Sequence, residues 1–505
     1  MPAPSLAPRD LDDLRDRGIP EAEARRILAR LQQPPRFVTL LRAGTRLDGV
    51  RALGQLEELT SRFDALELVP GKFTPMSGAA SRMFGFLEKV LADQATPDDA
   101  NKLGRFVQAL DRRHDGPRFA FDSDLAAVLR ARGQDLQQLI VAGEPRAVVA
   151  ALLDDDGLGF RSKPKALIPF HRRQGRAVLA LEEHLREAQG YAGNRLHITI
   201  SPEHRPLFEL ALVQIRTRCP ELASVQVDMS VQHPSTDALA LDVSTLALVR
   251  DADDRLAFFP AGHGALLRNL QELGRPAVLR NVDNVPASAR AREMVNRHHR
   301  ALAVVLAELK AELGRLIQEL DAGHLSRDEL RAGLDGLRER GVGVLLDPAR
   351  FDAAPDPDQR RMARYALDRP VKIAGMVRNE GEPGGGPFVV EHGGLTFLSI
   401  VEKDEIARDQ KQLMRDGEFF NPVDLLVDPT DHRGQPMDLQ RFVNQDRCFI
   451  VRKPYRGRDI LRLEQPGLWN GAMDGWTSLF VELPLETFAP VKEVNDLLRA
   501  QHQEA

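Results

Sequence analysis

Residues 66–91 read LELVPGKFTPMSGAASRMFGFLEKVL, and this stretch predicts the fold class. A short apolar run at 66–69 is followed by a loop of small residues at 77–83 and by a helix-like segment that starts at Met83. Strand, loop and helix in this order form the repeating unit of α/β proteins. The sequence therefore predicts an α/β fold with a mixed, mainly parallel sheet, because parallel strands need helical crossovers.

Two further strand-like segments end in polar residues. Residues 196–200 read Leu-His-Ile-Thr-Ile, and residues 277–282 read Ala-Val-Leu-Arg-Asn-Val. Open parallel sheets bind ligands at the carboxyl ends of their strands. We therefore expect the loops that follow these segments to take part in a binding site.

Helical segments extend and interrupt the α/β pattern. Residues 8–65 alternate charged and apolar positions at helical spacing, and Ala, Leu and Val recur in the same way further along the chain. The predicted organisation is a helical N-terminal extension at 1–65, an α/β core at 66–370 with helical insertions near 95–160 and 287–340, and a C-terminal part at 371–505.

The composition of the 505 residues excludes several classes of protein. A net charge of -5 gives no basic surface for nucleic acid, so we expect no such partner. Cys219 and Cys448 form no CxxC or Cys/His spacing, which argues against a disulfide framework and a structural zinc site. No apolar run reaches the ~18 residues of a membrane span. The sequence predicts a soluble, cytoplasmic protein without a membrane partner and gives no oligomeric state.

The loop of small residues is a candidate phosphate site. Ser77, Gly78 and Ala79 leave the main chain open to an anion, and Arg82 can bind two phosphate oxygens with its planar guanidinium. The helix that follows adds partial positive charge at its N-terminus. The alternative is an ordinary strand-to-helix turn with a surface arginine.

Two lysines stand beside prolines. Lys165 lies in Ser162-Lys-Pro-Lys-Ala-Leu-Ile-Pro169, and Lys492 follows Pro490 in Phe488-Ala-Pro-Val-Lys492 ahead of an apolar segment expected to be helical. Proline stiffens the backbone and lowers the entropic cost of aiming a cation. Only eleven of the 69 basic residues are lysines, which makes generic surface charge a weaker explanation. A solvated basic turn is the alternative for Lys165.

Asp283 is the candidate metal ligand. It ends the strand-like segment 277–282 and is flanked by Asn281 and Asn284. Magnesium takes carboxylate oxygens, waters and substrate phosphates, and often needs only one or two protein carboxylates. The alternative is an Asx turn that closes a strand.

Further segments carry candidates for recognition of a base and a sugar. Gly262 and His263 lie in Pro260-Ala-Gly-His-Gly264, and Gln232 lies upstream in a polar loop. Glu402 ends the segment Ile400-Val-Glu, and Asn421 begins Asn-Pro-Val-Asp. A hairpin corner for Gly-His-Gly and a solvated edge for Glu402 are the alternatives.

These segments resemble known motifs in their order along the chain. The loop at 77–83, Pro164-Lys-Ala-Leu-Ile-Pro169, the Gly-His-Gly loop, Asn281-Val-Asp-Asn284 and the block at 488–496 resemble those of UDP-sugar pyrophosphorylases. The phrases Pro466-Gly-Leu-Trp469-Asn-Gly and Pro490-Val-Lys-Glu-Val-Asn-Asp496 also resemble an uncharacterised bacterial family, a domain of unknown function, that is similar to nucleotidyltransferases.

The resemblance implies a glycosyltransferase-A-like, Rossmann-like fold and a function. It implies that a nucleoside triphosphate and a sugar 1-phosphate react to give a nucleotide sugar and pyrophosphate. Arg82, Lys165 and Lys492 would contact phosphates, Asp283 would hold Mg²⁺, Ser77, Gly78, Ala79, Gln232, Gly262 and His263 would bind the nucleotide, and Glu402 and Asn421 the sugar. Because the phosphate loop is poor in glycine, the alternative is an inactive nucleotide- or sugar-phosphate-binding protein on the same fold.

Overall fold

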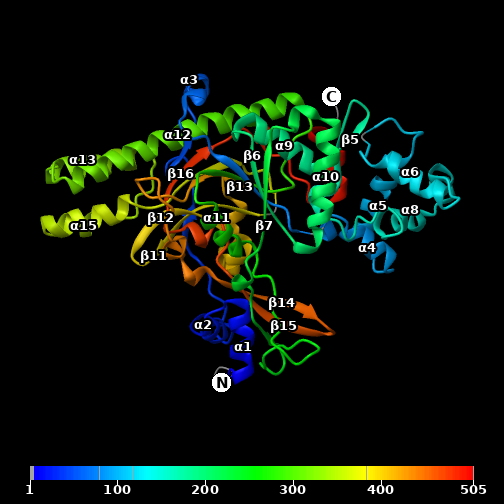
Figure 1. Cartoon of the computed structure of the whole chain (residues 1–505), viewed down its shortest axis with the longest axis horizontal. Coiled ribbons are helices and arrows are strands. Elements are labelled where there is room, and N and C mark those ends of the chain that lie inside the picture. The colour runs from blue at the N-terminus through cyan, green and yellow to red at the C-terminus, as the bar shows by residue number, and fades with distance from the viewer. Residues whose placement is uncertain (1–4, 79, 117, 383, 504–505) are drawn as a thin grey trace. The chain divides into compact units, whose positions relative to one another are not determined.

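The computed structural model describes residues 5–78, 80–116, 118–382 and 384–503, and these form two compact units. Unit 1 comprises residues 1–55, 232–276 and 302–483, and unit 2 comprises 56–231, 277–301 and 484–505. The boundary at 301/302 falls inside the long helix α12 (Ala289–Asp321) (Figure 1). This interleaved division differs from the three segments predicted from the sequence, whose boundaries stay a prediction.

Unit 2 contains a parallel four-stranded array in the order β9-β3-β6-β7. Its strands are β3 (Gly71–Pro75), β6 (Arg195–Ile200), β7 (Gln226–Val231) and β9 (Ala277–Arg280), with an antiparallel hairpin of β4 (Pro169–Arg173) and β5 (Arg176–Leu179). Its helices are α3 (Leu56–Ser61), α4 (Gly85–Leu91), α5 (Pro97–Leu110), α6 (Asp122–Ala131), α7 (Leu136–Ala142), α8 (Pro145–Leu153), α9 (Ala180–Tyr191) and α10 (Arg205–Arg218).

Unit 1 contains three groups of strands. The array β2-β16-β10-β13 has parallel pairs except for the antiparallel β10–β13 pair, and the sheets β1-β11-β12 and β14-β15-β8 are antiparallel. The strands are β1 (Thr39–Ala43), β2 (Val50–Ala52), β8 (Ala240–Asp242), β10 (Val371–Arg378), β11 (Gly385–His392), β12 (Leu395–Glu402), β13 (Phe419–Asp428), β14 (Phe449–Tyr455), β15 (Arg458–Glu464) and β16 (Thr477–Glu482).

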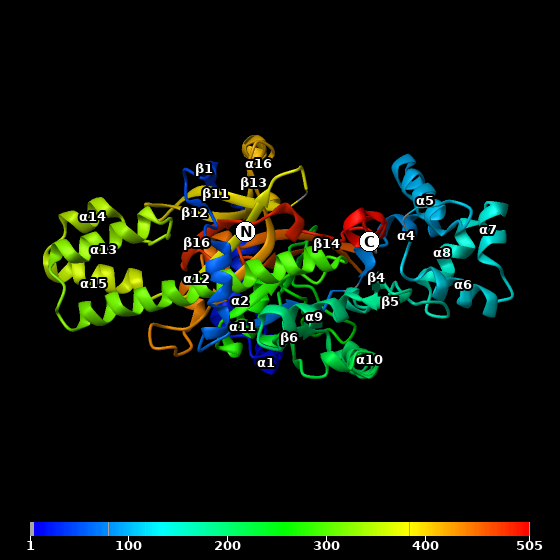
Figure 2. The same ribbon diagram turned by 90° about the horizontal axis from the view of Figure 1, so that it is seen from above.

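The helices of unit 1 include a group that lies together at one end of it. α13 (Arg327–Glu339), α14 (Pro348–Ala353) and α15 (Asp356–Leu367) lie side by side (Figure 2). The remaining helices are α1 (Pro8–Arg17), α2 (Glu21–Leu31), α11 (Leu267–Leu273) and α16 (Lys411–Arg415). Within the described residues, no helix is both long and apolar enough to cross a membrane.

The fold class predicted from the sequence is confirmed at the level of a mixed α/β protein, in which each unit holds one mainly parallel array of strands. The helical character predicted near 95–160 and 287–340 is also confirmed, by α5 to α8 and by α12 and α13. The helical prediction for 8–65 is wrong at 39–52, which form β1 and β2. These strands pair with β11 and β16, more than 300 residues away, and such tertiary pairing overrides local spacing.

The first predicted strand is displaced. Residues 66–69 form no strand, and Leu68 is largely exposed, whereas β3 begins at Gly71, just after Pro70. The sequence did not predict this buried strand because its second residue is a lysine, which interrupts the apolar pattern. Lys72 is fully buried, and its ammonium pairs with the Glu187 carboxylate of α9.

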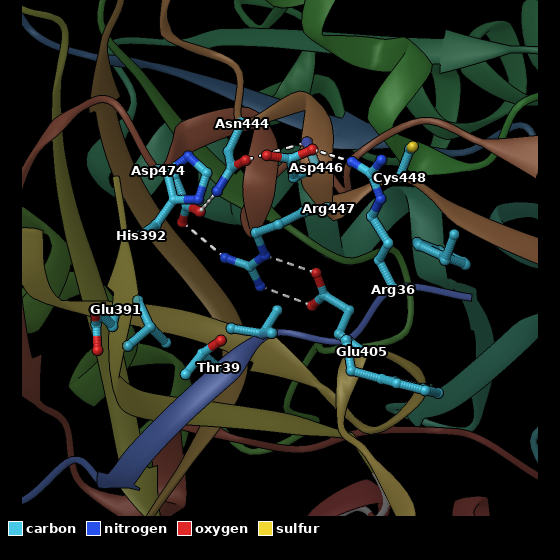
Figure 3. A pocket seen from close by; sticks show the side chains of 14 residues that line it. Arg36, Thr39, Glu391, His392, Glu405, Asn444, Asp446, Arg447, Cys448 and Asp474 are labelled. Carbon is cyan, nitrogen blue, oxygen red and sulfur yellow. Dashed lines mark hydrogen bonds and ion pairs between the residues drawn. The ribbon is translucent and has the colours of Figure 1, made fainter. Parts of the chain in front are cut away.

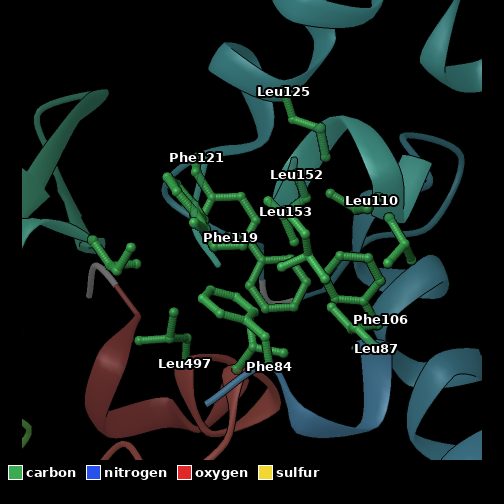
Figure 4. Close-up of a cluster of buried hydrophobic side chains, with 14 of the residues drawn as sticks. Phe84, Leu87, Phe106, Leu110, Phe119, Phe121, Leu125, Leu152, Leu153 and Leu497 are labelled. Carbon is green, nitrogen blue, oxygen red and sulfur yellow. The ribbon is translucent and has the colours of Figure 1, made fainter. Parts of the chain in front are cut away.

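The main core of unit 2 joins the helical segment to the C-terminal residues. Phe84, Phe106, Phe119 and Phe121 form an aromatic cluster, and Leu497 packs into it from the C-terminal segment (Figure 4). Val491 and Val494 belong to the same core. Burial of each such side chain stabilises the fold by roughly 1.5–3 kcal/mol. This packing fixes the segment that carries Lys492.

Candidate functional site

Lys165, Asp283 and Lys492 meet in unit 2. The Lys165 Nζ lies 3.0 Å from Asp283 Oδ2 and donates to the Val491 carbonyl oxygen at 2.5 Å. The Lys492 Nζ lies 3.3 Å from the same Oδ2. Two lysines from distant parts of the sequence thus converge on one carboxylate oxygen of Asp283.

Local backbone pairing sets this geometry. Asp283 follows β9, and its carbonyl accepts a hydrogen bond from the Val491 N–H at 3.0 Å. The Asn284 side chain accepts another from the Ala489 N–H at 2.9 Å. Lys492 and Glu493 donate their backbone N–H groups to Asp496 Oδ2, at 2.7 and 2.8 Å. The predicted helix after Lys492 is a short 3₁₀ turn, Val494–Leu498.

The small-residue loop lies against both lysine segments. The Lys165 N–H donates to the Gly78 carbonyl at 3.2 Å, and the Ala80 N–H donates to the Lys163 carbonyl at 3.1 Å. On the other side, the Val494 N–H donates to the Met83 carbonyl at 2.9 Å. The structure thus brings together segments that the helical residues 97–153 separate in the sequence.

The other residues of this loop are more open. The Ser77 carbonyl accepts from the Ser201 hydroxyl at 3.2 Å, and a Cβ added at Gly78 would meet no atom within 4 Å. Arg82 is exposed and makes no hydrogen bond or ion pair with the other described residues. Ala79 lies outside the described residues.

Burial and charge set the protonation of the cluster. Burial lowers the pKa of Lys165 below its usual value, although Asp283 opposes this effect. Burial alone would raise the pKa of Asp283, but the charges of Lys165 and Lys492 outweigh it and hold that pKa below its ordinary value. The cluster thus places two basic side chains around one carboxylate oxygen, an arrangement that can offer positive charge to an anion.

Asp283 also fits a role as a single-carboxylate magnesium ligand. Its Oδ1 is buried and has no hydrogen-bond partner among the described residues, whereas both lysines contact Oδ2. The described residues contain no group of three or more His, Cys, Asp or Glu side chains arranged to hold a metal. A cation here would need most of its ligands from water and from substrate phosphates, as Mg²⁺ commonly does.

The residues predicted to bind the base lie in unit 1. Gly262 has φ +75°, a backbone conformation that favours glycine, and a Cβ there would lie 2.6 Å from Glu464 Oε2. The His263 ring stacks on Trp469 with centroids 4.1 Å apart, and its Nδ1 accepts from the Leu468 N–H at 3.0 Å. Gln232 Nε2 is buried without a hydrogen-bond partner among the described residues.

Glu402 joins this group. Its carboxylate accepts a hydrogen bond from the Trp469 indole at 3.0 Å and lies 3.7 Å from His263 Nε2. Burial would raise the pKa of Glu402, but His263 and Trp469 lower it to about 2, so the side chain is a carboxylate at neutral pH. Sequence reasoning missed Trp469 as a site residue. The sequence offered one indication of its importance, because Trp469 is one of only two tryptophans and lies between two glycines.

A buried arginine supports the turn that carries Glu402. Arg447 donates to both oxygens of Glu405 at 2.8 Å (Figure 3). It also donates to the Ile400 carbonyl at 2.7 Å. Glu405 in turn accepts from the Glu402 N–H at 2.9 Å and from the Asn470 amide at 3.1 Å. Arg447 therefore connects the end of β12, through Glu405, to the loop that follows Trp469.

Asn421 lies in a distorted part of β13. Its side-chain oxygen accepts from the Val423 N–H at 3.0 Å, and Val423 has φ +57°. The pairing of β10 with β13 shifts register here, between Gly375 and Val377. A β-branched residue in the left-handed region is strained, and such strain is concentrated at functional sites. The sugar-binding role of Asn421 stays a prediction.

The described candidates fall into two sets. Unit 2 holds those predicted to contact phosphate and metal, which are Ser77, Gly78, Arg82, Lys165, Asp283 and Lys492. Unit 1 holds those predicted to contact base and sugar, which are Gln232, Gly262, His263, Glu402 and Asn421. In unit 2 Lys165 and Lys492 meet at Asp283, and in unit 1 His263 lies next to Glu402. Among the described residues, no hydrogen bond or ion pair links Gln232 or Asn421 to His263.

A family model described as "Domain of unknown function (DUF4301)" matches residues 7–503. The chain belongs to this family. No curated protein matches the sequence. The DUF4301 assignment confirms the resemblance to an uncharacterised family that the C-terminal phrases indicated, and it covers nearly the whole chain.

Solved structures similar to this DUF4301 chain are UDP-sugar pyrophosphorylases. A uridine diphosphate N-acetylglucosamine pyrophosphorylase from Trypanosoma brucei is 12% identical, with 99% of this chain and 84% of that chain covered and a TM-score of 0.40. A UDP-glucose phosphorylase from Trypanosoma brucei is 15% identical, with 66% of this chain and 60% of that chain covered and a TM-score of 0.35. A variant UDP-glucose pyrophosphorylase from Leishmania major, in complex with UDP-glucose, is 14% identical, with 66% of this chain and 61% of that chain covered and a TM-score of 0.35. The chain thus spans about three fifths of the length of these last two proteins.

Proposed function

We propose that this DUF4301 protein is a sugar-1-phosphate nucleotidyltransferase with a glycosyltransferase-A-like fold. Its substrates are a nucleoside triphosphate, with uridine favoured by the Gly262-His263-Gly264 resemblance, and a sugar 1-phosphate. Its products are a nucleotide sugar and pyrophosphate. The observation that carries the proposal is the convergence of Lys165 and Lys492 on Asp283 within 3.3 Å, because each residue comes from a different pyrophosphorylase-like motif.

The proposed chemistry is an in-line displacement at phosphorus. A phosphate oxygen of the sugar 1-phosphate attacks the α-phosphorus of the triphosphate, a P–O bond forms, and the bond to the β-phosphate oxygen breaks with release of pyrophosphate. Such a reaction needs the protein chiefly to position the reactants and neutralise charge. Mg²⁺, when bound, would neutralise phosphate charge and align the reacting oxygens.

The residues of the chain have separate roles in this proposal. Lys165 and Lys492 bind the reacting phosphates as ammonium groups, and Arg82 binds the triphosphate from the edge of the small-residue loop. Asp283, whose Oδ1 has no hydrogen-bond partner among the described residues, would hold the cation. In unit 1, Gly262 and Gln232 offer backbone and amide groups to the base, and Glu402 offers a carboxylate to sugar hydroxyls.

The direct test is pyrophosphate release. Purified protein with Mg²⁺ is expected to release pyrophosphate only when a triphosphate and a sugar 1-phosphate are both present, across a panel of both. Lys492→Ala is expected to lower this rate by a factor of about 10²–10³, because one phosphate-binding charge is lost. Lys89→Ala, which removes a lysine that pairs with Asp99, is the matched control and should retain full activity. Equal rates in wild type and Lys492→Ala would contradict the assignment.

Tryptophan emission tests the base-binding set. Uridine triphosphate is expected to change the emission of the wild-type protein, because the ring of Trp469 stacks on His263. In Trp469→Phe, the change should disappear although buried Trp476 remains. If uridine triphosphate changes the emission of Trp469→Phe as much as that of wild type, the base does not bind next to His263.

A second function follows from the glycine-poor loop. Side chains at Ala80 and Ser81 narrow the approach to the main chain compared with a run of glycines, which favours a nucleotide- or sugar-phosphate-binding protein without turnover. This alternative is supported if no combination in the panel yields pyrophosphate while a triphosphate still raises the melting temperature.

A further inference from the structure

The Asp283 carboxylate has two oxygens in different situations. Oδ2 accepts both lysines, at 3.0 and 3.3 Å, whereas Oδ1 is buried without a partner among the described residues. The Asp283 side chain is only 11% exposed, and that of Lys165 only 14%. Two positive charges therefore lie close to the one oxygen that is free for a cation, in a place where water screens poorly.

We propose that Lys165 and Lys492 compete with a divalent cation for Asp283, so that the cation binds there together with a phosphate group that draws the lysines away. Like charges repel a free cation at this carboxylate, but an anionic phosphate offers each ammonium a new partner and brings further oxygen ligands. Lys492 is the more accessible of the two lysines, since its side chain is 44% exposed. Cation and phosphate binding are then coupled, with each raising the affinity of the other.

This inference concerns the regulation of the proposed active site and rests on the proposed function for the identity of the phosphate. The alternative is a permanent structural ion pair that no ligand opens. The two differ in one measurable respect. Competition predicts that removal of one lysine exposes a cation site that the wild-type protein masks.

A titration with Mn²⁺ alone tests the competition without turnover. The electron paramagnetic resonance signal of the free ion measures how much Mn²⁺ the protein binds. Lys492→Ala is expected to bind Mn²⁺ at least about tenfold more tightly than wild type, a gain that is one decade in Kd. Lys89→Ala removes the same charge from unit 2 without contact to Asp283 and should leave Mn²⁺ affinity unchanged. The double variant Lys492→Ala with Asp283→Asn should lose the gain.

Two results overturn the proposal. One is equal Mn²⁺ affinity in wild type and Lys492→Ala, and the other is a gain that persists in the Asp283→Asn background. An equal thermal transition in the single variant shows that the fold is intact. In a separate arm, dialysis with uridine triphosphate should increase wild-type Mn²⁺ retention at least about tenfold over Mn²⁺ alone. If the protein fails to bind the triphosphate, the proposed substrate is wrong, while the comparison with Mn²⁺ alone still decides the competition.

Discussion

Asp283→Asn is expected to lower pyrophosphate release by a factor on the order of 10³, comparable to the loss of a principal charge-stabilising group in other active sites. The amide has nearly the same shape but no charge. It cannot hold a divalent cation as a carboxylate does, and it no longer attracts Lys165 and Lys492 to their observed positions. Initial rates with both substrates at saturation measure the effect.

The same change should also affect stability, and a second variant separates the two effects. Lys165 is mostly buried, so Asp283→Asn leaves a buried ammonium without its carboxylate partner, at a cost of about 1–3 kcal/mol. Lys165→Met added to Asp283→Asn removes that unpaired charge and is expected to restore much of the free energy of unfolding. Activity should stay lost in the double variant. Turnover that survives in Asp283→Asn would rule out the metal assignment.

Local patterns in the sequence predicted the elements whose packing follows their own periodicity. α5 begins at Pro97 after Thr96, whose hydroxyl accepts from the Asp99 N–H while the Asp99 carboxylate accepts from the Thr96 N–H, a pattern visible in the sequence. Strand β6 was found because apolar residues alternate with polar ones over 196–200, and β9 because 277–279 form a continuous apolar run. Strand β3 was misplaced because the buried charge of Lys72 is neutralised by Glu187, a partner more than 100 residues away.

Local sequence patterns were also insufficient to predict how the residues of the candidate site come together. The sequence identified Lys165, Asp283 and Lys492 one at a time, because prolines and amides mark their turns. Their meeting depends on backbone pairing between Asp283 and Val491 and on the core contacts of Leu497, which are tertiary facts. For unit 1, the roles of Trp469 and Arg447 depend on side-chain geometry that no local spacing encodes.

Arg447→Met is expected to lower the free energy of unfolding by about 3–5 kcal/mol, the range for removal of one partner of a buried ion pair. All five N–H groups of the guanidinium have acceptors within 2.8 Å, on Glu405, Asp474, Ser399 and Ile400. Methionine fills a similar volume but leaves two buried carboxylates without their cation. Urea unfolding of both proteins measures the difference, and Arg452→Met, at an exposed pair with Asp459, should cost less than about 1 kcal/mol.

The pH dependence of this loss identifies its cause. Burial raises the pKa of Glu405 above its ordinary value even though Arg447 opposes the rise, so loss of Arg447 should raise that pKa further. A carboxyl whose folded pKa exceeds its unfolded pKa destabilises the fold above the folded pKa, and protonation removes the penalty as the pH falls. The destabilisation by Arg447→Met should therefore be smaller at pH 5 than at pH 8. An equal loss of stability at both pH values would mean that packing, not the unpaired carboxylates, accounts for the effect. A loss below about 1 kcal/mol would show that Arg447 does not stabilise the turn that carries Glu402.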